Sequence, residues 1–161
     1  MIDARMFLAM LFAGLVAIAA PGSACVVPAD LAALQAELLQ HLNAERADAG
    51  LSALRVSSKL TKAAQGHACD NADRMSISHT SSDGGTLQDR LRAVGYRYRA
   101  AAENTGRSFA TPARAVEWWM GSEKHRSNIL LRKIREVGIG IAVSAAPDSR
   151  LHWILVFAAP K

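Results

Sequence analysis

The sequence predicts an α+β fold in which a series of helices precedes a short block of strands. Apolar residues recur at helical spacing in the early part of the chain, as in the stripe Leu31, Leu34, Leu38 and Leu42. From Val137 onward the chain becomes rich in Val and Ile with turn residues between the runs, which is typical of an antiparallel hairpin. Segregated helices and strands favour packed α+β layers over alternating βαβ units.

The leucine stripe predicts a first helix over residues 28–49, with Gly50 as its C-cap. A second, alanine-rich helix begins near Ser57 or Ser58, both suitable N-caps, and its apolar stripe extends to Met75.

Turn residues and caps divide the rest of the chain in the same way. A turn-forming segment at 76–86 is followed by a helix over 87–94, which Thr86 caps and Gly95 ends, and by an irregular or extended stretch at 96–102. A helix then starts at Thr111-Pro112, and a short helix covers 124–130. Two strands that begin at Val137 and Leu151 are joined by a turn at 146–149.

The first 24 residues have the layout of a secretory signal peptide. The uncharged stretch from Met6 to Ala20 is 15 residues long, which is short of the ~20 that a spanning helix needs. Small residues precede a cut after Ala24. We expect residues 1–24 to be removed, residues 25–161 to form one secreted or periplasmic domain, and no transmembrane span to remain; an uncleaved anchor is the alternative.

The chain has two cysteines, Cys25 and Cys69. Gly22-Ser23-Ala24-Cys25 has features of a lipoprotein box, although Gly22 replaces the usual large aliphatic residue. The other interpretation is a disulfide between the two cysteines, as is usual for an exported protein with one pair. We favour the disulfide over lipid anchoring at Cys25.

Composition excludes several classes of protein. The chain is 50% hydrophobic and 20% charged, so it is not intrinsically disordered. Its net charge of +5 is too diffuse to indicate a nucleic-acid partner. We interpret the basic groups, including Arg90, as solvated faces rather than as contacts to anionic envelope polymers or headgroups.

Several short motifs occur in a specific order. They are Leu42-Asn43-x-x-Arg46 with Gly50-Leu51, His79 in Ile77-Ser78-His79-Thr80, Gly95-Tyr96, Ala102-Glu103-Asn104, Trp119-Met120-x-Ser122-x-x-His125-Arg126-x-Asn128-Ile129-Leu130, and Glu136-Val137-Gly138-x-Gly140. Each is weak alone, but over residues 31–159 the ordered set resembles the bacterial branch of the CAP superfamily, also called SCP/PR-1-like.

This resemblance implies a three-layer α-β-α sandwich with a central antiparallel sheet, in a secreted or envelope-associated protein. It also implies a cavity with two histidines and two acidic residues, which holds zinc or another divalent ion in some members. His79 matches the first cavity histidine, and Glu103 matches the glutamate before Asn104. Ser122 stands where eukaryotic members have an acidic residue, and His125 is the bacterial branch's own histidine.

The candidate cavity or metal residues are therefore His79, Glu103 and His125, with Asn104 and Ser122 in support. Two histidines and a glutamate with water are a known catalytic zinc set. The three are far apart in the sequence, so only folding can bring them together. Plainer interpretations stay open: a loop histidine, an exposed strand-end glutamate, and a serine that caps a helix instead of orienting His125.

Other residues carry weaker expectations. His67 lies on an apolar stripe and is interpreted as a core histidine, whereas His152 is expected to face solvent. Trp118 and Trp119 are adjacent, so we expect one to be buried and the other to border a groove.

Three functions fit these observations, and catalytic residues are not identified. The first is a monomeric, non-catalytic module for an unknown envelope or extracellular ligand. The second is a metal-dependent, peptidase-like hydrolase, and the third is a carrier of lipids or small apolar molecules. The missing acidic ligand at Ser122 and the absence of a nucleophile motif such as Gly-x-Ser-x-Gly favour the first.

Overall fold

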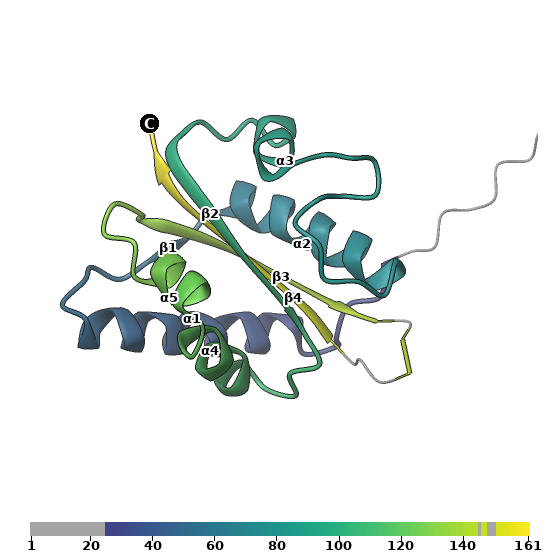
Figure 1. The fold of residues 1–161 in the computed structure, drawn as a ribbon, viewed down its shortest axis with the longest axis horizontal. Helices are drawn as coiled ribbons and strands as arrows, with labels where there is room; N and C mark the ends of the chain where they lie inside the picture. Colours follow the sequence, from purple (N-terminus) through teal and green to yellow (C-terminus); the bar gives the residue numbers. More distant parts are fainter. Residues whose placement is uncertain (1–24, 145, 148–150) are drawn as a thin grey trace, which may run out of the picture.

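A computed structural model describes residues 25–144, 146–147 and 151–161. The expected signal peptide and residues 148–149 of the expected turn lie outside the described residues. The elements, labelled in Figure 1, are α1 (Leu31–Asp48), β1 (Arg55–Val56), α2 (Ser58–Asp73), α3 (Leu87–Ala93), β2 (Tyr98–Arg107), α4 (Pro112–Met120), α5 (Glu123–Ile129), β3 (Glu136–Val143) and β4 (Leu151–Pro160).

The four strands form one sheet between two layers of helices, which confirms the predicted three-layer α-β-α sandwich. The strand order is β1-β3-β4-β2, and the long strands β2, β4 and β3 are antiparallel. The two-residue strand β1 adds a short parallel pair to β3. Helices α2 and α3 lie on one face, and α1, α4 and α5 lie on the other (Figure 1).

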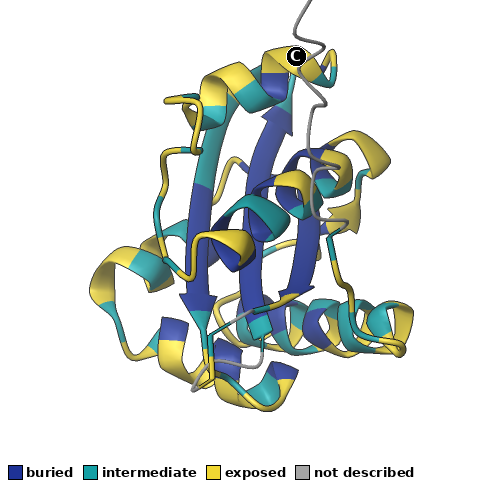
Figure 2. Ribbon diagram, turned by 90° about the vertical axis from the view of Figure 1, so that its right-hand side faces the viewer, coloured by how far each residue is buried: buried dark blue, intermediate teal, exposed yellow. Residues whose placement is uncertain are grey.

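Strand β4 shows why the sheet is the centre of the molecule. Trp153, Leu155 and Phe157 belong to the core shared with α1, α4 and α5, whereas the alternate residues Ile154 and Val156 belong to the core under α2 and α3. Because side chains alternate between the faces of a strand and both faces are covered, the strand is buried along most of its length (Figure 2).

Coverage of both faces also corrects the expectation for His152, which is 1% exposed rather than facing solvent. Its Nε2 hydrogen-bonds with the hydroxyl of Ser144 at 3.0 Å. Burial lowers the pKa of His152, and the positive charge of Arg107 lowers it further, while a backbone hydrogen bond to Ser76 opposes both effects.

Two glycines let helix α2 approach strand β3 closely. A Cβ on Gly138 would overlap the backbone of Leu60, and a Cβ on Gly140 would overlap the backbone of Ala64. The alanine-rich face of α2 completes this contact, since small side chains keep the helix close to the sheet.

The main departure from the expected elements is strand β2. The sequence indicated an irregular or extended stretch at 96–102, but a strand runs from Tyr98 to Arg107 and pairs with β4, with one register shift between Tyr98 and Ala100. Its AENTG segment is polar and lacks the apolar alternation of a strand, so long-range pairing decides its conformation.

The helix boundaries follow the expected caps. Gly50, at φ +67°, ends α1, and the NH groups of Gly50 and Leu51 bond back to the last turn of the helix. Thr86 forms a capping box with Asp89 at the start of α3. Thr111 caps α4 just before a proline in its first turn.

The predicted disulfide joins Cys25 to Cys69 on α2. The segment after Cys25 follows the sheet, because the Val26 carbonyl accepts a hydrogen bond from the Val143 NH at 2.8 Å. Among the described residues, no helix is both long and apolar enough to cross a membrane.

Candidate functional site

The candidate site is centred on Glu103, whose side chain is 3% exposed on edge strand β2. Its Oε1 accepts a hydrogen bond from Nδ1 of His79 at 2.8 Å, and its Oε2 accepts one from Nη2 of Arg90 at 2.6 Å. Nε2 of His67 lies 3.9 Å from Oε1. A buried carboxylate needs such partners, because burial without them strongly disfavours its charge.

Arg90 is not the solvated residue that the sequence indicated. Its side chain is 11% exposed and reaches from α3 across to β2. Nη1 donates to the carbonyls of His79 and Gly85 and to the hydroxyl of Ser81, so this guanidinium joins the 76–86 loop to Glu103.

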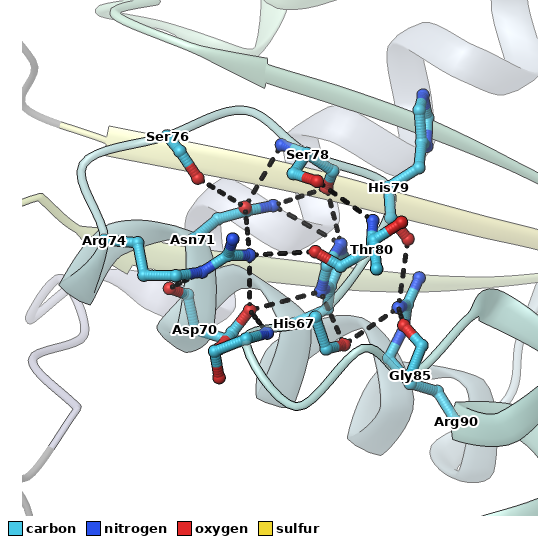
Figure 3. A network of polar contacts seen from close by, with 12 residues as sticks. His67, Asp70, Asn71, Arg74, Ser76, Ser78, His79, Thr80, Gly85 and Arg90 are labelled. Atoms are coloured by element: carbon cyan, nitrogen blue, oxygen red, sulfur yellow. Dashed lines mark hydrogen bonds and ion pairs between the residues drawn. The ribbon is translucent and has the colours of Figure 1, made fainter.

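The loop that carries His79 is fixed from below by α2, as Figure 3 shows. The Asn71 amide donates to the Ser78 carbonyl at 2.9 Å and accepts from the Ser78 NH at 3.1 Å. His67 donates through Nε2 to the same carbonyl at 2.7 Å, while its Nδ1 lies 3.3 Å from the hydroxyl of Ser81. The imidazole of His79 points away from this network, and its side chain is 60% exposed.

His67 is the buried histidine that its helical stripe predicted, at 1% exposure. Burial lowers its pKa, and the negative charge of Glu103 opposes that effect, while the positive charge of Arg90 adds to it. The neutral ring therefore supports the loop beneath His79.

Asn104 links β2 to α5 on the other face of the sheet. Its side chain turns to the face opposite Glu103, where Nδ2 donates to the His125 carbonyl at 3.1 Å and Oδ1 accepts from Asn128 at 2.8 Å. Asn128 also donates to the Glu103 carbonyl at 3.2 Å. These bonds attach α5, and with it His125, to β2.

His125 lies beside this cluster without a hydrogen bond to Glu103 or His79 in the part of the chain that the structure describes. Its ring packs on Trp118 with 5.1 Å between centroids, and its Nδ1 is buried without a partner among the described residues. Burial lowers the pKa of His125, and the charges of His79 and Lys124 lower it further. The structure therefore brings His79 and Glu103 into direct contact and places His125 nearby.

Trp118 also lines a cleft of about 400 Å³. Trp118 is 49% exposed, whereas Trp119 is fully buried and donates to the Thr105 carbonyl at 3.0 Å, as expected for adjacent positions on a helix. Ser122 stands at the N-cap position of α5, but its side chain makes no capping hydrogen bond. The cleft is lined by Phe109, Arg114, Glu117, Trp118, Gly121 and Ser122.

Comparison with known proteins identifies the family. Residues 39–157 match the Cysteine-rich secretory protein family, CAP. The match spans most of the chain, so this protein belongs to the CAP family.

Relatives place it among bacterial CAP proteins. The uncharacterized protein YkwD of Bacillus subtilis (strain 168) is 32% identical over 119 residues, which cover 74% of this chain and 46% of YkwD. An extracellular SCP-domain protein from Bacillus anthracis is 26% identical with a TM-score of 0.67, over 76% of this chain and 39% of that one. The chain thus spans less than half the length of either relative.

An outer surface protein from Borrelia burgdorferi shares the fold over its whole length. Its TM-score is 0.74 at 16% identity, over 86% of this chain and 100% of that one. A structure of NaASP2 with Zn²⁺ also shares the fold, at a TM-score of 0.54 and 12% identity over 81% of this chain and 80% of that one.

The side chains around Glu103 do not fit a metal centre. In the described residues there is no group of three or more His, Cys, Asp or Glu side chains positioned to hold a metal ion. Both carboxylate oxygens of Glu103 are engaged, and the cationic guanidinium of Arg90 lies 2.6 Å from one of them. A fixed positive charge at that distance repels a divalent cation.

The sequence did not indicate that Arg90 pairs with Glu103, and it indicated His67 only as a core residue, not as a support of the 76–86 loop. Arg90 has no local signal, because its partner Glu103 lies on a different element. One signal for the role of His67 is present in the sequence. His67 and Asn71 are polar, lie one helical turn apart and interrupt the apolar stripe of α2, which indicates that this face of the helix also contacts polar groups.

Proposed function

We propose that this CAP protein is exported and acts outside the cytoplasm as a non-catalytic module that binds an envelope or extracellular ligand. The leader-like residues 1–24 support export, and the B. anthracis relative is described as extracellular. A bridge between Cys25 and Cys69 fits an oxidising compartment. A sulfur in that bridge carries no lipid, which supports a protein without a lipid anchor.

The observation that carries the binding proposal is the exposure of Trp118. It is half-exposed at a cleft and packs between two rings, with centroids 5.3 Å from Phe109 and 5.1 Å from His125. A large aromatic surface held rigid by its neighbours is typical of a binding site, because little side-chain entropy is lost when a ligand covers it.

The state of Glu103 supports a non-catalytic role. A general base or metal ligand needs an accessible carboxylate oxygen, but here both oxygens accept short hydrogen bonds from Arg90 and His79. The carboxylate instead ties the 76–86 loop and α3 to the edge of the sheet. The imidazole of His79 remains exposed on the solvent side of this carboxylate.

Isothermal titration calorimetry tests this proposal with soluble peptidoglycan fragments, short peptides and a fatty acid as probes. We expect one probe class to bind, with about tenfold weaker affinity in Trp118→Ala and smaller loss in Trp118→Phe, because stacking contributes on the order of 1 kcal/mol. Binding that is unchanged in Trp118→Ala contradicts the proposed surface. Hydrolysis of a peptide that stops in His79→Ala supports the hydrolase instead, and fatty-acid binding independent of Trp118 supports the carrier.

Metal content is tested separately by elemental mass spectrometry after incubation with zinc at neutral pH. We expect no stoichiometric zinc, because Arg90 occupies the carboxylate. Stoichiometric zinc that is lost in a His79→Ala/His125→Ala double variant would contradict the argument that the side chains around Glu103 do not fit a metal ion.

A further inference from the structure

The starts of β1, β2 and β3 and the end of β4 meet at one end of the sheet, which we call the basic end. The strand register defines it: Tyr98 pairs with Pro160, and Glu136 with Ala158 and Arg55. This is the end marked C in Figure 1, whereas α4 follows the opposite end of β2. Its exposed basic residues, on strands and the loops beside them, are Arg55, Arg97, Arg99, Arg132, Lys133, Arg135 and Lys161.

A hollow of about 430 Å³ lies at the basic end. It is lined by Arg99, Lys133, Arg135 and Ala159, so three of its four lining residues are cations and the fourth is alanine. Three cations around one concave surface repel one another unless an anion is present, and a concave surface concentrates their field.

Two of the three cations are held in place by the main chain. Nε of Arg99 donates to the Pro160 carbonyl at 3.1 Å. Nη1 of Arg135 donates to the carbonyls of Arg132 and Ile134 at 2.6 and 2.8 Å. Neutral carbonyls orient the guanidinium groups without neutralising them, and the remaining NH groups stay available for an oxyanion.

The nearby carboxylate, Glu136, does not neutralise the hollow. It accepts a hydrogen bond from the Tyr96 hydroxyl at 2.6 Å and lies 3.7 Å from Nη2 of Arg55. Within the described part of the chain, Arg99, Lys133 and Arg135 make no ion pair. Arg46, fully buried on α1, adds a further cation, and its pKa is lowered by burial and then by the charge of Arg135.

A second hollow of about 580 Å³ also lies at the start of β2. Arg97 and Tyr98 line the second hollow and Arg99 lines the first, so both hollows border the start of β2. Arg92 and Lys161 also line the second hollow. The cations at this end are therefore spread over two hollows instead of one.

We propose that the basic end, which the sequence indicated to be a solvated face, binds a linear polyol-phosphate polymer joined by phosphodiester groups, with Arg99, Lys133 and Arg135 as the principal phosphate contacts. Bidentate guanidinium groups match phosphate geometry, and a chain of repeated charges reaches cations in both hollows, which a single small anion does not. This site is separate from the Trp118 cleft and does not depend on the function proposed there.

A flat lipid surface fits the basic end less well. Membrane-surface binding requires a basic face accompanied by exposed apolar side chains that enter the interface. Here the cations surround a strand end and line hollows. Of the exposed large hydrophobic residues on strands in the described chain, Val56 on β1 lies at this end, whereas Val143 lies at the far end of β3.

Calorimetric titration of the full chain with poly(glycerol phosphate) at low and moderate salt tests the proposal. We expect binding that weakens as salt rises, because bound phosphates release counterions. The triple variant Arg99→Gln/Lys133→Gln/Arg135→Gln should bind roughly tenfold or more weakly, since it removes three charge-assisted contacts.

A matched triple variant, Lys62→Gln/Lys124→Gln/Arg126→Gln, removes three exposed charges elsewhere and should retain the affinity. Equal loss in both triples overturns the proposal, because binding then follows net charge alone. Absence of binding at low salt overturns it as well. Inorganic phosphate that competes at equal affinity per phosphate, or tighter binding to phosphatidylglycerol vesicles, overturns the choice of a polymer.

A second measurement guards against misfolding of the triple variant. Backbone amide NMR shifts of the unmodified chain, titrated with the same polymer, should change around Arg99 and Arg135 and leave Trp118 unchanged. Shifts spread evenly over the exposed basic residues contradict the assigned site.

Discussion

Glu103 is best understood as a structural carboxylate with an exposed neighbour. Its side chain is almost fully buried, and Arg90 supplies the charge that makes this burial tolerable. His79 completes the cluster from the solvent side. The cluster therefore holds the 76–86 loop in one conformation, and the exposed imidazole is presented from a rigid base.

Replacing Arg90 tests this account. We expect Arg90→Met to lower the free energy of unfolding by about 3 kcal/mol, because it leaves the buried Glu103 carboxylate without its arginine partner. Arg92→Gln is the control, since that arginine pairs with Asp89 at the surface, and its loss should remain below about 1 kcal/mol. Urea unfolding measures both. A double variant with Glu103→Gln should recover part of the loss, and equal effects of the two arginines would refute the buried pair.

His152 leads to a prediction about pH. Its folded-state pKa lies below its ordinary value of about 6.5 because of burial, so the unfolded chain binds the proton more readily. Stability from this residue is fully present above that pH and falls as pH decreases below it, by at most about 1.4 kcal/mol per pH unit.

The variant His152→Gln, compared with the unmodified chain, tests this pH dependence. Urea unfolding between pH 8 and pH 5 should show a flatter acid loss for this variant than for the unmodified chain. His67 and His125, whose pKa values are also lowered, contribute with the same sign and keep a residual slope in the variant. Parallel curves would show that His152 does not contribute.

Among the elements, the contact between α2 and β3 determines how tightly one helical layer covers the sheet. Gly138 and Gly140 face α2 with no room for a side chain. The glycines and the small residues of α2 thus act together, since either set alone would leave the helix further from the strand.

Two glycine-to-alanine substitutions distinguish the packing of α2 against β3 from the intrinsic helix propensity of α2. Gly140→Ala should destabilise the protein by roughly 1–3 kcal/mol, because its Cβ would overlap the α2 backbone. Gly66→Ala on α2 meets open space and should stabilise by up to about 1 kcal/mol through helix propensity. Thermal unfolding of both variants checks the contrast, and destabilisation by both would contradict it.

Prediction of the elements succeeded where local signals exist. Gly50, Thr86 and Thr111 mark helix ends through caps that need only neighbouring residues, and the structure confirms all three. Strand β2 was not predicted in full, because its polar residues become a strand only through pairing with β4. The same limit applies to Arg90, whose role depends on a partner on another element.

For the whole molecule, the disulfide attaches the start of the described chain to α2. Cys25 lies 44 positions from Cys69, so the bridge closes a loop that includes α1 and β1. Val26 next to it pairs with the end of β3. The bridge therefore fastens a segment whose Val26 and Val27 side chains are exposed.

Reduction or a Cys25→Ser/Cys69→Ser variant should lower the free energy of unfolding by about 3–4 kcal/mol, because the unfolded chain gains loop freedom. Intact mass of the exported protein is the second measurement. A bridge without lipid removes two hydrogens after cleavage before Cys25, whereas a mass increase of hundreds of daltons would show acylation and contradict the proposed absence of an anchor.

The residues in their linear order were sufficient to predict the α+β class, the main helix boundaries, the paired cysteines and, through an ordered set of motifs, the CAP family. Those features depend on neighbouring residues or on order along the chain. Folding established that Arg90 neutralises Glu103, that His125 lies beside the cluster without bonding to it, and that scattered basic residues meet at one end of the sheet. Such contacts join residues distant in the sequence, and only strand pairing and layer packing set which of them meet.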